Sequence, residues 1–200
     1  MIAIIDYGMG NLRSVQKALE KVGAKALITH DAFTIEKSEK IVLPGVGAMK
    51  PAMEQLQDLK LIEPIKRVIE KGKPFLGICL GLQLLFEESD EGGRVNGIGI
   101  LKGSVKKFTQ GKVPHMGWNQ VNIKNKNARI FEGTKEASDV YFCHSYYVQP
   151  QENKIIASMT EYGINFVSAV ASNNVFGLQF HPEKSQKVGL QVLKNFVMMK

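Results

Sequence analysis

The chain has 200 residues, of which 44% are hydrophobic and 22% charged, and its formal net charge is +7. This length predicts a single domain, residues 1–200, and the composition is that of a soluble globular protein. Two cysteines exclude a disulfide framework and favour the reducing cytoplasm. The lysines are not interleaved with aromatic residues, and the N-terminal residues lack the pattern of a signal peptide or a membrane span. We therefore expect neither nucleic-acid nor membrane binding.

The first third of the chain alternates between strand and helix patterns. Asn11 is the expected N-cap of the first helix, whose apolar spacing continues until Gly23. Gly8 and Gly10 follow the first strand as a phosphate-binding loop would, but the third glycine of the dinucleotide fingerprint is missing, which favours a tight turn. We expect strands at 2–5, 25–29 and 40–44, and helices at 12–22, 48–58 and 61–71.

The strand at 40–44 ends in Pro44 and runs into the turn Gly45-Val46-Gly47. A turn of this kind presents backbone N–H groups in unusual conformations, as an oxyanion hole requires. Taken alone, the pattern indicates an ordinary glycine turn equally well.

A buried strand at 75–79 leads into Gly77-Ile78-Cys79-Leu80-Gly81, which has the G-x-nucleophile-x-G spacing of a nucleophile elbow. Glycines are needed on both sides because side chains would clash where a strand turns sharply into a helix. The turn would present the Cys79 sulfur at the start of a helix expected over 80–87, where free N–H groups favour the thiolate. A lone cysteine beside apolar residues is usually inert, so other motifs must decide its role.

The pattern changes after an acidic stretch at 87–93, which is expected to form a solvated surface loop. The later sheet is expected to be antiparallel or mixed, with short strands at 105–108, 119–123, 140–143, 155–158 and 166–169. Two clusters combine aromatic residues with histidine, at 114–119 and 141–147. A buried core explains most such clusters, whereas an exposed tryptophan with histidine and methionine beside it would suit a protein interface.

The strand at 175–180 ends in His181-Pro182-Glu183, and Ser185 is the expected N-cap of the last helix. A residue before proline is pushed towards extended backbone, in which residues i and i+2 point the same way. We therefore expect Glu183 to accept the Nδ1–H of His181, which leaves Nε2 available as a base. Both groups would project from the carboxyl edge of a parallel sheet.

These motifs together predict acyl transfer through a thioester. Cys79 is the predicted nucleophile, His181 the proton carrier and Glu183 the group that fixes the imidazole tautomer. The N–H of Leu80 and an N–H from the loop that holds Val46 and Gly47 would bind the oxyanion.

At these spacings, Gly-Ile-Cys-Leu-Gly-Leu-Gln, Pro-Gly-Val-Gly and Phe-His-Pro-Glu-Lys-Ser together resemble the class I (triad) glutamine amidotransferases. The stretches 5–15, 114–119 and 144–147 narrow the resemblance to the glutaminase subunits of imidazole glycerol phosphate synthase, over essentially the whole chain. The resemblance implies a three-layer α/β fold with a mostly parallel central sheet flanked by helices and an additional antiparallel or mixed portion. It implies no metal and no other cofactor.

The resemblance also implies a reaction and a partner. L-glutamine would be hydrolysed to glutamate and ammonia, and a (β/α)₈-barrel cyclase in a heterodimer would receive the ammonia. The cyclase would convert N′-(5′-phosphoribulosyl)formimino-aminoimidazole-carboxamide ribonucleotide (PRFAR) to imidazole glycerol phosphate and aminoimidazole-carboxamide ribonucleotide (AICAR) in histidine biosynthesis. Glutamine would be held by Gly47, Gln83, Glu91, Ser145 and Tyr146, and the cyclase would face His115, Met116 and Trp118.

In this family the glutaminase is nearly silent until the partner's site is occupied. We interpret this as an oxyanion N–H in the Gly45–Gly47 loop that turns into place on assembly.

Three alternatives remain open from the residues. An amidotransferase that serves another synthase would share the triad but lack the stretches at 5–15 and 114–119. A freestanding γ-glutamyl hydrolase would be fully active without a partner. A flavodoxin-like nucleotide-binding module would use Gly8-Met9-Gly10 and leave Cys79 inert, but it leaves the elbow, the glycine loop and the His-Pro-Glu triplet unexplained.

Overall fold

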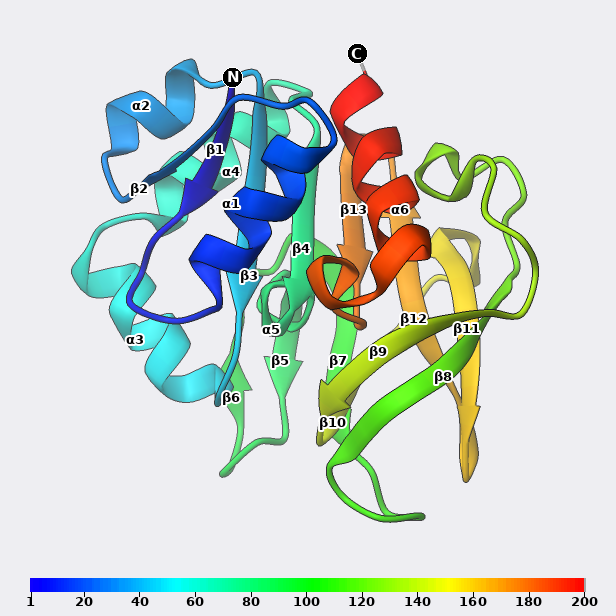
Figure 1. Cartoon of the computed structure of the whole chain (residues 1–200). Helices are drawn as coiled ribbons and strands as arrows, with labels where there is room; N and C mark the ends of the chain where they lie inside the picture. The colour runs from blue at the N-terminus through cyan, green and yellow to red at the C-terminus, as the bar shows by residue number, and fades with distance from the viewer. Residues whose placement is uncertain (200) are drawn as a thin grey trace.

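The computed structural model describes residues 1–199, which form a 13-stranded sheet whose parallel strands are covered by helices on both faces (Figure 1). The helices are α1 (Leu12–Lys21), α2 (Ala32–Lys37), α3 (Met49–Asp58), α4 (Ile62–Glu70), α5 (Leu80–Gln83) and α6 (Gln186–Met198), with short 3₁₀ helices η1 (Arg129–Phe131), η2 (Asn153–Ile155) and η3 (Pro182–Lys184). No helix in the described part of the chain is long and apolar enough to cross a membrane.

The sheet has a parallel half and a mixed half. The parallel half runs in the order β2 (Ala26–Thr29), β1 (Ile2–Ile5), β3 (Lys40–Gly45), β4 (Phe75–Cys79) and β13 (Val175–Leu178). In the register of these strands Gly45 pairs with Cys79, and Leu178 pairs with Ile78. Three neighbouring strands therefore end side by side at the carboxyl edge, where α/β proteins place their chemistry.

Alternating side chains of β1 join two separate apolar layers. Ile2 and Ile4 pack with residues of α1 and α6, whereas Ala3 and Ile5 pack with residues of α2, α3 and α4. Because both faces are covered, these strands read as continuous apolar runs. Figure 1 shows α1 and α6 together on the face nearer the viewer.

The mixed half confirms the predicted change of pattern. β12 (Ile164–Ser172) is antiparallel to β13 and continues the sheet through β10 (Tyr146–Pro150), β7 (Leu101–Lys107), β5 (Phe86–Ser89) and β6 (Val95–Asn96). A branch adds β11 (Ile156–Tyr162), β8 (His115–Ile123) and β9 (Ser138–His144), all antiparallel. The strands are generally longer than predicted, and β6, β10 and α2 were not predicted.

The helix predicted over 80–87 is wrong in its second half. Helix α5 ends at Gln83, and Phe86–Ser89 form β5, which pairs in parallel with β7. Residues 87–89 are therefore strand rather than the expected surface loop. An apolar run fits a buried helix or a buried strand, and here the pairing with β7 decides between them.

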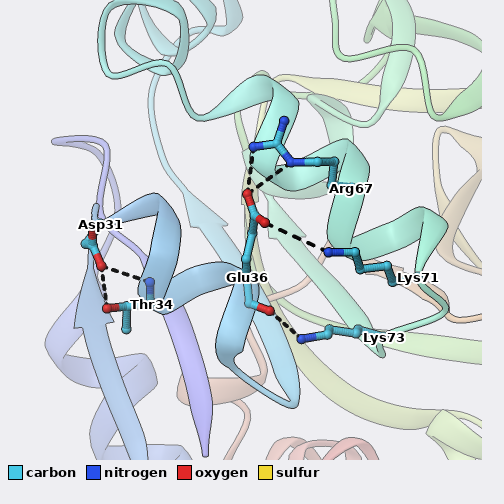
Figure 2. Close-up of polar contacts among 6 residues, drawn as sticks. All are labelled: Asp31, Thr34, Glu36, Arg67, Lys71 and Lys73. Atoms are coloured by element: carbon cyan, nitrogen blue, oxygen red, sulfur yellow. Dashed lines mark hydrogen bonds and ion pairs between the residues drawn. The ribbon is translucent and has the colours of Figure 1, made fainter.

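Helix α2 is held to its neighbours by the side chain and backbone of Glu36 (Figure 2). The Glu36 carboxylate accepts from Arg67 of α4, with Nη2 at 2.6 Å, and lies 3.9 Å from Lys71. Lys73 donates to the Glu36 carbonyl at 2.6 Å. The hydrogen bond from Arg67 is the largest cause of the lowered pKa of Glu36. These exposed contacts join α2, α4 and the start of β4 far from the carboxyl edge.

Candidate active site

A cavity of about 290 Å³ opens at the carboxyl edge of the parallel strands. Cys79 and His181 line it together with every residue predicted to hold glutamine or the oxyanion. The lining residues are Val46, Gly47, Cys79, Leu80, Gln83, Glu91, Pro114, Cys143, His144, Ser145, Tyr146, His181 and Lys184. The structure thus brings together residues that lie up to 138 positions apart in the sequence, between Val46 and Lys184.

The local backbone at Cys79 has the geometry of a nucleophile elbow. Cys79 has φ 54° and ψ −109°, a conformation that side chains rarely adopt and that often marks functional sites. A Cβ atom on Gly77 would lie 2.6 Å from the carbonyl oxygen of Gly81. A Cβ atom on Gly81 would lie 1.8 Å from the carbonyl oxygen of Leu43. The predicted need for glycine on both sides of Cys79 is therefore confirmed.

His181 and Glu183 form a buried pair beside Cys79. His181 is extended, with φ −95° and ψ 97°, and its Nδ1 lies 2.8 Å from Glu183 Oε1. Because a carboxylate only accepts, Nδ1 carries the proton and donates it. Burial lowers the pKa of His181, but hydrogen bonds and charge from Cys79 and Glu183 outweigh burial and raise it to about 10. The arrangement favours the protonated form of the His181 ring.

The backbone of His181 is fixed by strand β9. Its N–H donates to the Tyr141 carbonyl at 2.9 Å, and its own carbonyl accepts from Ser185 Oγ at 2.6 Å. Ser185 Oγ also accepts from Tyr141 N at 2.9 Å. Ser185 precedes α6, but its side chain makes no capping bond, so the predicted N-cap role is wrong for the hydroxyl. The hydroxyl instead joins His181 to β9.

Tyr7, which the sequence analysis did not single out, supports the start of the glycine loop. Its buried hydroxyl donates to the Pro44 carbonyl at 3.0 Å, and a Cβ atom on Gly45 would lie 2.3 Å from it. Burial, followed by the charge of Cys79, raises the pKa of Tyr7, so its hydroxyl keeps its proton. Gly47 has φ +96°, in the region that favours glycine, and lines the cavity. Leu80 contributes the other side of the predicted oxyanion site as the first residue of α5.

Gln83 joins the elbow helix to the Ser145-Tyr146 segment. Its Nε2 donates to the Tyr146 carbonyl at 3.0 Å and to Gln179 Oε1 at 3.1 Å. Since both N–H groups point to protein acceptors, the Gln83 oxygen is the atom available to a ligand. Gln179 itself was missed, although a glutamine in the apolar run 175–180 was a detectable signal.

The residues predicted to face a partner separate into exposed and buried side chains. Met116 and Trp118 on β8 are 60% and 49% exposed, whereas His115 is 2% exposed. His115 stacks on Phe142 and Tyr162, with centroids 4.8 and 3.9 Å away. The side chain of His115 therefore does not belong to a contact surface, because alternate residues of a strand face opposite sides.

Comparison with known proteins agrees with this geometry. Residues 3–200 match the family described as Glutamine amidotransferase class-I. Two relatives described as "Imidazole glycerol phosphate synthase subunit HisH" are each 54% identical to the chain. The first, from Syntrophotalea carbinolica, aligns over 98% of both chains, and the second, from Aquifex aeolicus, covers 96% of this chain and 94% of its own.

The fold has counterparts among solved structures. One titled "Structure of PurLQS from Thermotoga maritima" matches with a TM-score of 0.77 and 20% identity, over 98% of this chain and 96% of that chain. This similarity confirms the predicted fold class. The chain therefore belongs to the class I glutamine amidotransferases and, within them, to the family of the HisH subunits of imidazole glycerol phosphate synthase.

Proposed function

We propose that this chain is the glutaminase subunit of imidazole glycerol phosphate synthase and acts in the cytoplasm. It hydrolyses L-glutamine and delivers ammonia to a (β/α)₈-barrel cyclase subunit, which converts PRFAR to imidazole glycerol phosphate and AICAR. Relatives with this name that match over nearly the whole chain support the assignment. The observation that carries it is the single cavity that joins Cys79, His181 and the Val46–Gly47 loop.

The first half of the reaction forms a thioester. The Cys79 thiolate attacks the side-chain carbonyl carbon of glutamine, and the N–H groups of Leu80 and the Val46–Gly47 loop bind the oxyanion. The C–N bond then breaks, and the His181 imidazolium gives its proton to the leaving nitrogen, which departs as ammonia. Glu183 keeps the ring oriented throughout, as its 2.8 Å contact with Nδ1 supports.

The second half releases glutamate. A water molecule loses a proton to His181 and adds to the thioester carbonyl, and the same N–H groups bind the oxyanion again. The C–S bond breaks, so that glutamate leaves and Cys79 returns to the thiolate beside a protonated His181. Both halves use the same proton carrier, so no cofactor is required.

Two parts of the cavity suit the α-amino acid end of glutamine. Glu91 supplies a negative charge for the α-ammonium, and the Gln83 oxygen supplies a neutral acceptor. The Ser145-Tyr146 segment also lines the cavity, and the hydrogen bonds from Gln83 and His144 to the Tyr146 carbonyl hold this segment in place.

The partner would dock beside the mouth of this cavity. Among the exposed apolar side chains, Val46 lines the cavity, Val113 precedes the lining residue Pro114, and Met116 and Trp118 follow on β8. Exposed tryptophan and methionine are enriched at interfaces. A cyclase covering this face would close the cavity to water and receive the ammonia. The Gly47 loop at the mouth would turn its oxyanion N–H into place on assembly.

The test is glutamate release from glutamine by three samples: the purified chain, the chain with a matching cyclase, and that complex with PRFAR. We expect low activity alone, strong stimulation in the third sample, and none with Cys79→Ala. Full activity of the isolated chain would indicate a freestanding hydrolase. The cyclase used must be active with free ammonia. If such a cyclase does not stimulate glutamate release by the chain, the chain serves another synthase.

A further inference from the structure

Gln179 is a buried amide at the end of β13, two residues before His181. It is fully buried in the described structure, between the apolar residues Leu178 and Phe180. An amide in such surroundings is costly unless its polar atoms find partners. It is absent from the lining of the cavity, so it lies behind the reacting atoms and not against a substrate.

Both polar ends of Gln179 meet atoms of the site. Its Nε2 donates to Cys79 Sγ at 3.7 Å, and its Oε1 accepts from Gln83 Nε2 at 3.1 Å. Its backbone N–H is bound to the Ser168 carbonyl at 2.9 Å, which holds the residue against β12.

The orientation of the Gln179 amide follows from a chain of donors and acceptors. The Tyr146 carbonyl can only accept, so the nitrogen of Gln83 must face it, at 3.0 Å. The second N–H of Gln83 then faces Gln179, whose oxygen must meet it. The nitrogen of Gln179 is thereby directed at the Cys79 sulfur. No other assignment satisfies all three amide contacts.

The two hydrogen-bond contacts of the Cys79 sulfur therefore favour different protonation states of the sulfur. The Cys143 carbonyl, 3.7 Å away, accepts a hydrogen bond from the protonated thiol, whereas the Gln179 N–H stabilises the thiolate. A donor fixed in a buried, low-dielectric site stabilises a charge more than the same donor in water. Unlike His181, this donor cannot lose its proton as the reaction proceeds.

We propose that Gln179 is a further catalytic residue that donates an amide hydrogen bond to the Cys79 thiolate, with Gln83 as the residue that orients this amide. The inference rests on the proposed glutaminase function. It assigns Gln83 two functions, since its nitrogen orients Gln179 while its oxygen remains for glutamine. Loss of Gln179 should weaken the nucleophile and leave glutamine binding intact.

The test compares Gln179→Leu and Gln179→Glu with wild type and with Ser168→Ala. Ser168 is a matched control because it is buried next to Gln179, and its hydroxyl bonds to Ser158 at 2.8 Å and not to Cys79. The first readout is the rate of Cys79 alkylation by iodoacetamide from pH 5 to 9, followed by peptide mass spectrometry to separate Cys79 from Cys143. The second is kcat and KM for glutamine in the cyclase complex.

We expect Gln179→Leu to shift the alkylation profile to higher pH and to lower kcat roughly ten- to hundredfold, the effect of one hydrogen bond to a charged group. KM should stay within about twofold because Gln179 does not line the cavity. Gln179→Glu should be slowed most at high pH, where its carboxylate repels the thiolate. Ser168→Ala should keep the wild-type profile. Circular dichroism shows whether each variant folds. If one of the two Gln179 variants does not fold, the kinetics of the other one test the proposal.

The two proposals fail differently. Unchanged alkylation and kcat in a folded Gln179 variant would overturn this inference while leaving the glutaminase proposal intact. A shifted alkylation profile in a chain whose wild type never releases glutamate would overturn the glutaminase proposal but not the contact between Gln179 and Cys79.

Discussion

The Glu91 carboxylate binds the start of helix α3: its Oε2 accepts from Met49 N at 2.6 Å, across 42 positions of sequence. Met49 lies two residues after Gly47, and Ala48 between them, at the N-cap position, has no side chain able to cap the helix. A carboxylate at this position satisfies a free N–H and complements the positive end of the helix dipole. Glu91 therefore anchors the Gly47 loop as well as lining the cavity.

Two substitutions at Glu91 separate these roles. Glu91→Gln keeps an acceptor for Met49 N but removes the charge, so we expect a raised KM for glutamine with little change in thermal stability. Glu91→Ala also removes the cap, and it should lower the free energy of unfolding by roughly 1 kcal/mol. Steady-state kinetics and urea denaturation of both variants test this. A wild-type KM in Glu91→Gln would refute the ammonium contact.

The His181 ring should titrate far above the two buried rings of His115 and His144. Cys79 and Glu183 raise its pKa from 6.5 to about 10, so its stabilising contribution is complete below pH 6.5 and is lost as pH rises towards 10. NMR of the imidazole carbons, with His181→Asn to assign the resonance, should give a midpoint near 10. A midpoint near 6.5 would show that the thiolate–imidazolium pair does not form.

Glu183→Gln should leave the fold in place and remove most of the activity. A glutamine of the same shape can still contact Nδ1, but it has no charge to stabilise the imidazolium, so we expect kcat to fall by roughly 10² to 10⁴. The His181 titration should move below about 10 in the same variant. Glu136→Gln is a suitable control, because Glu136 bonds to the Ile123 N–H on an exposed surface. Wild-type kcat in Glu183→Gln would exclude an electrostatic role for Glu183.

The buried histidine pair should make the fold sensitive to acid. Asn119 Nδ2 donates to His115 Nε2 at 3.3 Å, so His115 Nδ1 carries the proton and donates to His144 Nε2 at 2.9 Å, while His144 Nδ1 donates to the Tyr146 carbonyl at 2.7 Å. Each ring has one accepting nitrogen in this network and is therefore neutral. Burial lowers the pKa of His115 to about 4 and that of His144 to about 3. Their contribution to stability is complete above pH 6.5 and is lost as pH falls towards 4, because the unfolded chain then binds protons that the buried rings do not.

Urea denaturation between pH 7.5 and 4.5 measures this loss. The free energy of unfolding should fall less over this range in His115→Gln than in wild type, because the variant has one fewer buried imidazole to protonate. Parallel pH dependences in the two proteins would contradict the account. The comparison is between the slopes of unfolding free energy against pH in the two proteins. The carboxylates contribute equally to both slopes, so their contribution cancels.

Short-range chemistry made much of the candidate site predictable from the sequence. A side chain at Gly77 would clash with the backbone of Gly81, and the contact of His181 with Glu183 depends on the proline between them, so both constraints act within a few residues of the chain. The central parallel strands β1, β3, β4 and β13 were equally clear, because strands buried on both faces are uniformly apolar.

The contacts that were missed join segments distant in sequence. Tyr7 hydrogen-bonds to Pro44, Ser185 to Tyr141 and Gln179 to Cys79. Only the strand order brings these partners together. The end of α5 and the extent of β5 depend on pairing with β7, which no local pattern encodes. The burial of His115 was unpredictable because the face of β8 that points inward is set by its register with β9.

The most direct test of the central claim is detection of the thioester. The complex turning over glutamine is quenched in acid and its peptides are analysed by mass spectrometry. The account predicts a γ-glutamyl group on Cys79, absent when glutamine is omitted and absent in Cys79→Ala. Glutamate release by Cys79→Ala at the wild-type rate, with no modified cysteine in either protein, would contradict it.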